Sequence, residues 1–500
     1  MLNFMRYNGK IMSLTRQIAR NTLVQLIGRL ISVALALVVV VIMTRALGPE
    51  GFGGYSTIIA FLQFFGIVVD FGLTLTANRM LGALSSSVSS QANQQRDHAK
   101  LTPSRLMSNL MTLRFFSAVI FLGLAPIVAL AFPYPTAVKQ GMFLTSLSFL
   151  AIIMGQTLVP VFQKELKMGA VAIAELAGRI ALLAGVILAA YFKTNLLWFM
   201  AAIVAGSATQ YLYLRCAVSK FIKLHFVFDW PLWRRIIRTS WPIGLSVIFN
   251  LIYLKADIII LSVLRSQSEV GFYGAAYRVL DQFTALATMF MGLVLPPLTA
   301  AWIASDRGRF ARIFQRAFDA FALLAWPLLI SALIIGRPLM VFVAGPDFAL
   351  AGDILRILMI AMACVFFSTL FGHVVVVINK QKAMIWGYII TAVLALGAYG
   401  LAIPHYGIWG AAWATVFSEI LILVATFIMV WKNTRFKPSL VLFSKSLLSS
   451  IIMGLALYAL RGYHVLILIF SAMLIYALAI YALRGVRKEL IRDIVFSRPS

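Results

Sequence analysis

This chain of 500 residues contains fourteen apolar runs, each long enough to cross a bilayer as a helix. A helix needs about 20 apolar residues to cross a hydrocarbon core of about 30 Å. The runs lie near residues 22–44, 55–81, 107–132, 141–162, 170–192, 196–218, 241–264, 272–302, 318–343, 353–378, 384–403, 407–431, 443–460 and 464–483. They predict an all-α polytopic membrane protein with about 14 transmembrane helices.

Composition agrees with this class. The chain is 62% hydrophobic and 12% charged, and its mean hydropathy is +0.95, which excludes an ordinary soluble domain. A net charge of +27 would suggest a nucleic-acid partner in a soluble protein. In a membrane protein the same excess arises from basic residues retained on the cytoplasmic side. We therefore expect membrane lipids, and no nucleic acid, among its partners.

The basic residues also predict the topology. They gather in alternate connections between the runs, near residues 79–105, 164–167, 220–238, 307–316, 380–382 and 432–437, and in the tail from residue 484. The intervening connections carry few charges. This alternation predicts that the basic connections and both termini are cytoplasmic.

The chain is expected to contain two similar halves. Gly53 and Tyr55 align with Gly271 and Tyr273 at an offset of 218 residues. We expect a six-helix lobe at 1–218, a cytoplasmic amphipathic linker at 219–240, a second six-helix lobe at 241–431, and helices 13 and 14 with a basic tail at 432–500. Since each lobe has an even number of spans, the lobes would run parallel and enclose a central cavity.

Cations without a local partner are the strongest site candidates. A charge inside a bilayer costs roughly 2.5–3.5 kcal/mol on insertion scales, so it indicates a functional site by default. Arg29, Arg114 and Lys255 have no acid three or four residues away. At about 1.5 Å per residue, the two arginines lie about 12–14 Å and Lys255 about 20 Å from the cytoplasmic boundary. Such a cationic cavity would suit a diphosphate.

Other intramembrane charges have weaker claims. Arg179 and Arg278 each have an acid one helical turn away and can be neutralised locally. Asp70, Asp257 and Glu419 are either ion-coupling sites or interhelical partners of the cations. Asp257 points about 200° around the helix from Lys255, so these two do not pair easily. The alternative for Arg29 and Arg114 is an interhelical salt bridge or a reach toward the headgroups.

Chemical motifs point to transport rather than catalysis. There is no ATP-binding GxxxxGK[ST] loop and no HExxH metal motif, and Cys216 and Cys364 are the only cysteines. We expect no cofactor, no metal site and no enzymatic activity.

Six segments resemble the polysaccharide flippases of the O-antigen translocase (Wzx) type, in the superfamily shared with lipid II flippases and multidrug and toxin extrusion transporters. They are TRALGPEGFGGYS at 44–56, VDFGLTLTANRMLG at 69–82, SWPIGLSVIFNLIYLKADIIILSVL at 240–264, EVGFYGAAYRV at 269–279, VAGPDFALAGDILRIL at 343–358 and GIWGAAWATVFSE at 407–419.

The resemblance implies alternating access in a bacterial inner membrane. The substrate would be an undecaprenyl-diphosphate-linked oligosaccharide, a repeat unit of O-antigen, capsule or exopolysaccharide, moved from the cytoplasmic to the periplasmic leaflet. A polysaccharide polymerase and a chain-length regulator are possible partners. Arg29, Lys255, Asp257 and Arg278 fall at matched positions, whereas Arg114 and Arg179 are candidates from depth and pairing.

Two other functions stay open at this point. A cation-coupled multidrug exporter of the same superfamily shares the two-lobed plan, but its site would favour buried acids over bases, and Asp70 would be the residue to test. A membrane polysaccharide polymerase or ligase is the third hypothesis, and the short loops between the runs count against it.

Overall fold

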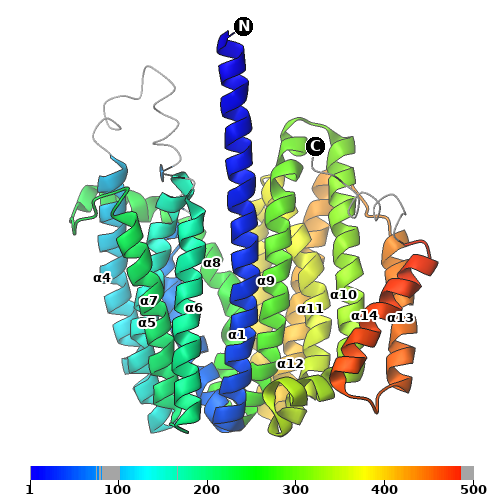
Figure 1. Ribbon diagram of the computed structural model, residues 1–500. Coiled ribbons are helices and arrows are strands. Elements are labelled where there is room, and N and C mark those ends of the chain that lie inside the picture. The colour runs from blue at the N-terminus through cyan, green and yellow to red at the C-terminus, as the bar shows by residue number, and fades with distance from the viewer. Residues whose placement is uncertain (1, 75, 78–79, 82–101, 166, 486–500) are drawn as a thin grey trace. The chain divides into compact units, whose positions relative to one another are not determined.

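The computed structural model describes residues 2–74, 76–77, 80–81, 102–165 and 167–485 (Figure 1). Eleven helices in this part of the chain are long and apolar enough to cross a membrane. Large apolar side chains such as Ile120 and Leu455 are 62% and 70% exposed, as expected for a protein whose solvent is lipid. The all-α polytopic class is confirmed, while the number of fourteen spans and the side of the termini stay predictions.

The chain forms two compact units, Met1–Leu251 and Ile252–Ser500. The division falls inside one continuous helix, α8 (Trp230–Leu264), which contains both the end of the predicted linker and the seventh apolar run. The end of the predicted amphipathic linker is therefore helical and continuous with the seventh apolar run. The lobe boundaries proposed from the sequence stay predictions.

The first unit consists of long helices. Its helices are α1 (Leu2–Asp70), α4 (Pro103–Leu130), α5 (Thr136–Lys164), α6 (Met168–Tyr191), α7 (Leu196–Val218) and the first part of α8. One large cluster of buried apolar side chains lies between α4, α5, α7 and α8.

Gly48 divides α1 into two arms. Its φ of +63° is a left-handed conformation that favours glycine, and Pro49 follows, a residue suited to the first turn of a new helix. Gly28 lies beside the first turn of α6, Gly54 beside the first residue of α7, and Gly66 beside the middle of α5. The first arm thus runs along α6 and the second returns along α5, so α1 contains two of the predicted runs.

Small residues let α6 and α7 approach closely. A Cβ atom on Gly178 would lie 2.8 Å from the carbonyl oxygen of Gly206, and a Cβ atom on Gly206 would lie 2.8 Å from that of Gly178. Farther along, Gly185 faces Ala202. Because lipid gives helices little hydrophobic reason to associate, such backbone contact is a main source of packing energy.

The second unit has a similar construction. It contains the rest of α8, then α9 (Gln267–Ile303), α10 (Arg307–Ala344), the 3-10 turn η1 (Pro346–Phe348), α11 (Ala349–Val377), α12 (Gln381–Thr434), α13 (Val441–Ala459) and α14 (Val465–Ala482). Ser446 of α13 and Tyr476 of α14 donate hydrogen bonds to the backbone of α10, which fixes these last two helices beside it (Figure 1).

Gly407 divides α12 as Gly48 divides α1. Its φ is +56°, and an added Cβ atom would lie 2.6 Å from a carboxylate oxygen of Glu269. The Arg265 guanidinium donates to the carbonyls of Ile403 (3.1 Å) and Pro404 (2.6 Å), where the first arm ends. A cation at the end of a helix satisfies its last carbonyls and complements its dipole. The α8–α9 junction therefore holds the bend in α12.

The contact between α6 and α7 generates a stability prediction. Gly178→Ala should destabilise the protein by about 1–3 kcal/mol, because the new methyl group meets a backbone oxygen that cannot move away easily. Gly123→Ala on α4 is the matched control, since nothing lies within 4 Å of its Cβ position. Thermal unfolding in detergent should give a lower midpoint for Gly178→Ala alone. Equal midpoints for the two variants would contradict the packing account.

Candidate functional site

Lys255 of α8 and Arg278 of α9 share one carboxylate in the second unit. Lys255 Nζ lies 3.0 Å from Asp281 Oδ1, and Arg278 Nη1 lies 3.9 Å from Asp281 Oδ2. The Lys255 ammonium also lies 4.3 Å from the centre of the Tyr277 ring, a cation–π distance. The side chains of Lys255, Arg278 and Asp281 are 16%, 25% and 32% exposed, so the cluster is open on one side. It holds two cations and one anion, a net positive charge.

A different set of partners surrounds Asp257, two residues from Lys255. Its buried carboxylate accepts hydrogen bonds from the Tyr273 hydroxyl (2.6 Å) and the Ile258 backbone N–H (2.7 Å). Thr415 Oγ1 of α12 lies 2.9 Å from the Tyr273 hydroxyl and 3.2 Å from that of Tyr399. These bonds join α8, α9 and α12 through a buried polar network. Such a network stabilises the fold only if every polar group in it has a partner, because an unpaired buried polar group costs free energy.

Glu419 adds a second buried acid. It lies on α12 one helical turn after Thr415, is 4% exposed, and is close enough to Asp257 for their charges to interact. The second unit therefore holds a partly exposed cationic cluster and, separately, two buried carboxylates.

In the first unit, Arg114 and Asp70 form an ion pair between α4 and the end of α1. Arg114 is 1% exposed, and it also donates to Thr74 Oγ1 (2.6 Å) and Thr157 Oγ1 (2.9 Å). Asp70 in turn accepts a hydrogen bond from the Thr74 hydroxyl at 2.5 Å. This geometry favours the interhelical salt bridge that the sequence left as an alternative, and substrate contact by Arg114 stays a prediction.

Two candidates in the first unit have weaker structural support. Arg179 is half-buried on α6, and the ion pairs among the described residues do not include it. Arg29 falls within α1, but its side chain lies outside the described residues. Their roles remain predictions. Within the part of the chain that the structure describes, no cluster of three His, Cys, Asp or Glu side chains is placed to hold a metal ion.

The sequence did not identify the partners of Lys255 and Asp257. Asp281 is 26 residues from Lys255, and Tyr273 is 16 residues from Asp257. One signal was available: α8 ends at Leu264 and α9 begins at Gln267, so counting outward from this short turn places Lys255 and Asp257 within one residue of the positions opposite Tyr277 and Tyr273. No comparable rule would have predicted Thr415 on α12.

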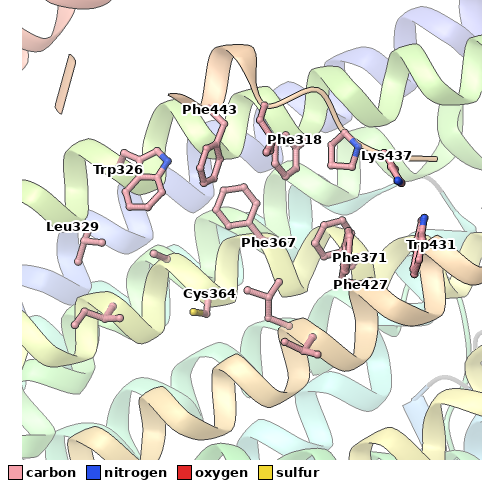
Figure 2. A pocket seen from close by; sticks show the side chains of 16 residues that line it. Phe318, Trp326, Leu329, Cys364, Phe367, Phe371, Phe427, Trp431, Lys437 and Phe443 are labelled. Carbon is pink, nitrogen blue, oxygen red and sulfur yellow. The ribbon is translucent and has the colours of Figure 1, made fainter. Parts of the chain in front are cut away.

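An apolar pocket of about 830 Å³ lies elsewhere in the second unit, between α10, α11, α12 and α13 (Figure 2). Lys437 is the one charged residue that lines it. Much of the wall consists of aromatic side chains, those of Phe318, Trp326, Phe367, Phe371, Phe427, Trp431 and Phe443. Lys437 is exposed, and its ammonium lies 5.7 Å from the centre of the Trp431 ring. The pocket thus offers a hydrocarbon surface with a cation at its edge.

Solved structures share this fold. The inward closed conformation of the lipid II flippase MurJ superposes with a TM-score of 0.75 over 95% of this chain and 100% of that chain, at 15% identity. An inward-facing multidrug resistance transporter of the MATE family gives a TM-score of 0.60 over 83% of this chain and 97% of that chain, at 13% identity.

Sequence comparisons identify the family. The chain is 24% identical over 260 residues to a Haloferax volcanii protein named as the probable low-salt glycan biosynthesis flippase Agl15. That match covers 50% of this chain and 54% of the relative, so the chain spans about half the length of that protein. The model of the polysaccharide biosynthesis protein family matches residues 18–303, more than half of the chain. This multi-pass membrane protein therefore belongs to the polysaccharide biosynthesis protein family.

Proposed function

We propose that this chain is a flippase that moves an undecaprenyl-diphosphate-linked oligosaccharide from the cytoplasmic to the periplasmic leaflet of a bacterial plasma membrane by alternating access. The single observation that carries the proposal is the cluster of Lys255, Arg278 and Asp281, where two cations face one carboxylate. The Haloferax volcanii relative and MurJ are both named as flippases, of glycan biosynthesis and of lipid II, which supports a lipid-linked glycan as the substrate class.

The cluster suits an exchange between a carboxylate and a diphosphate. Without substrate, Asp281 is the shared partner of the two cations and offsets part of their charge, because an unpaired charge inside a bilayer would be costly. A diphosphate offers several anionic oxygens, which accept from an ammonium and a guanidinium at once. When the substrate leaves, Asp281 recaptures both side chains. Binding and release thus differ by the exchange of one anion for another.

The lipid part of the substrate also has a suitable surface in this chain. A polyprenyl chain is hydrocarbon, and the aromatic pocket of Figure 2 has an apolar wall with Lys437 at its edge. Burial of hydrocarbon against such a wall contributes roughly 25 cal/mol per Å² of apolar surface. A substrate with an anionic head and a long apolar tail matches both features of the second unit.

Arg29, Arg114 and Arg179 are secondary candidates for contact with the sugar or the diphosphate. The Arg114 guanidinium already forms an ion pair with Asp70 and donates hydrogen bonds to Thr74 and Thr157, so we assign Arg114 mainly to the stability of the first unit. A polysaccharide polymerase and a chain-length regulator would act on the product after its release in the periplasmic leaflet.

A second candidate function is a cation-coupled exporter of amphiphilic drugs. The observation that favours it is the pair of buried carboxylates, Asp257 and Glu419, since buried acids are suited to carry a coupling ion. In a flippase, the same two residues could couple an ion gradient to glycan movement.

Variants of the cationic cluster test the proposed function. Lys255→Gln should reduce transport of a fluorescent diphosphate-linked glycan in proteoliposomes by about 10–100-fold, because a charge-assisted hydrogen bond of about 1.5–3 kcal/mol is lost. Lys255→Arg should retain most transport, and Lys164→Gln, at an exposed lysine of α5, should retain all of it.

The charge-exchanged double variant separates substrate binding from structure. Lys255→Asp with Asp281→Lys keeps the net charge and can re-form the ion pair between α8 and α9. If Lys255 binds the diphosphate, folding should be restored but transport should stay low. Restored transport would assign Lys255 a structural role and contradict the proposal.

Asp257→Asn distinguishes the two candidate functions. Asparagine keeps the size of the side chain and an acceptor for Tyr273, but it cannot ionise. Under the flippase proposal, overexpression of the wild-type chain leaves cell tolerance to ethidium unchanged, and so does the variant. Raised tolerance that Asp257→Asn abolishes would favour the drug exporter.

A further inference from the structure

The first three turns of α8 carry a stripe of exposed aromatic and basic side chains. Trp230, Arg234, Ile237, Arg238 and Trp241 are exposed, and their spacings of four, three, one and three residues place them on one side of the helix. A tryptophan stands at each end, and two arginines one turn apart stand between them. We call these five residues the α8 stripe.

The opposite side of α8 is fixed to the first unit. Leu232, Trp233, Ile236 and Ser240 are buried. Trp233 Nε1 donates to Asn109 Oδ1 at 3.1 Å, and Ser240 Oγ donates to Thr76 Oγ1 at 2.8 Å. Because this face is held by packing and by hydrogen bonds, the α8 stripe has a defined outward direction.

The extended segment before α8 enlarges the same surface. The backbone N–H groups of His225 and Val227 donate to the hydroxyls of Ser108 (3.2 Å) and Thr112 (3.1 Å) on α4. Side chains alternate along an extended chain, and Phe226 and Phe228 are 68% and 67% exposed. The Phe228 ring stacks with Trp230 at 6.4 Å between centroids. The backbone of residues 225–227, which is hydrogen-bonded to α4, therefore places the rings of Phe226 and Phe228 beside the α8 stripe.

The surface is strongly basic, and its one acid, Asp229, is already paired with Arg105 of α4. Between residues 219 and 241 the basic side chains are exposed: Lys220, Lys223, Arg234, Arg235 and Arg238. Asp229 is the only acid in this range. Its carboxylate accepts from Arg105 at 2.6 Å and from the Leu232 N–H at 3.2 Å, and the Arg105 hydrogen bond, chiefly, lowers the pKa of Asp229. The Asp229 charge therefore stabilises the segment on α4 and does not neutralise the stripe.

We propose that the α8 stripe binds the headgroup of an anionic phospholipid. Arg234 and Arg238 would hold the phosphate oxygens, while Trp230 and Trp241 occupy the boundary between headgroups and hydrocarbon, where amphipathic rings are favoured. The α8 helix continues from Trp241 into the seventh apolar run, which the sequence predicts to span the membrane, so we expect the stripe at the edge of the bilayer. Its charge matches anionic lipid. The proposal goes beyond flipping and uses residues outside the Lys255 cluster.

Lipid titration of the full-length protein in detergent tests this inference. Arg234→Gln with Arg238→Gln should weaken binding of dioleoylphosphatidylglycerol by about tenfold or more, since each basic residue near anionic lipid adds to affinity. Binding of dioleoylphosphatidylcholine should not change. Arg309→Gln with Arg312→Gln is the matched control, because it removes two exposed arginines from α10, and it should change affinity less than about twofold.

Three results of this titration would overturn the proposal. The first is unchanged phosphatidylglycerol binding in the Arg234 and Arg238 variant. The second is an equal loss of binding in the control, which would indicate non-specific attraction. The third is displacement of phosphatidylglycerol from these arginines by geranyl diphosphate, which would assign the stripe to the flipped substrate. A second measurement keeps both arginines: brominated phosphatidylglycerol should quench tryptophan fluorescence less in Trp230→Phe with Trp241→Phe than in the wild-type chain, and equal quenching would also contradict the inference.

Discussion

The cost of a charge inside a bilayer is the constraint on which this structure depends. A charged side chain inside a spanning helix is stabilised by a partner within the protein, since lipid provides none. Arg114 meets this demand with Asp70 in the first unit, and Lys255 meets it with Asp281 in the second. The two solutions differ in exposure. The Arg114 guanidinium is enclosed and hydrogen-bonded on several sides, whereas the Lys255 cluster is partly open and carries an extra cation, Arg278, so it keeps a capacity to bind an anion.

The backbone obeys the same rule. A chain that reverses at the edge of a membrane leaves helix ends whose polar groups must be satisfied. At Gly48 and Gly407 the chain turns with a positive φ and starts the next helix at once. In the second unit, Arg265 covers the carbonyls exposed at the turn before Gly407. This arrangement couples the α8–α9 junction to α12, and the same three helices hold the buried network of Asp257, Tyr273 and Thr415.

The sequence predicted the class well and the partners of the charges poorly. Run length and hydropathy suffice for the helices, because a spanning helix is a local property. Ion pairs across helices are not local. Lys255 has no acid within one turn, yet Asp281 on the next helix reaches it. Arg179 has Glu175 one turn away, yet the ion pairs among the described residues do not include Arg179. Arg356 and Asp353, three residues apart, do pair at 2.8 Å. Spacing along one helix permits an ion pair but does not ensure it.

The most direct test of the account is the fate of the lipid-linked glycan in cells that lack this protein. Lipids would be extracted, and enzymes added outside spheroplasts would report which leaflet holds the glycan. The account predicts that a complete, unpolymerised unit on an undecaprenyl diphosphate accumulates on the cytoplasmic leaflet, and that the wild-type gene clears it. Normal lipid intermediates in such cells, together with altered drug tolerance, would contradict the account and shift attention from Lys255 to Asp257.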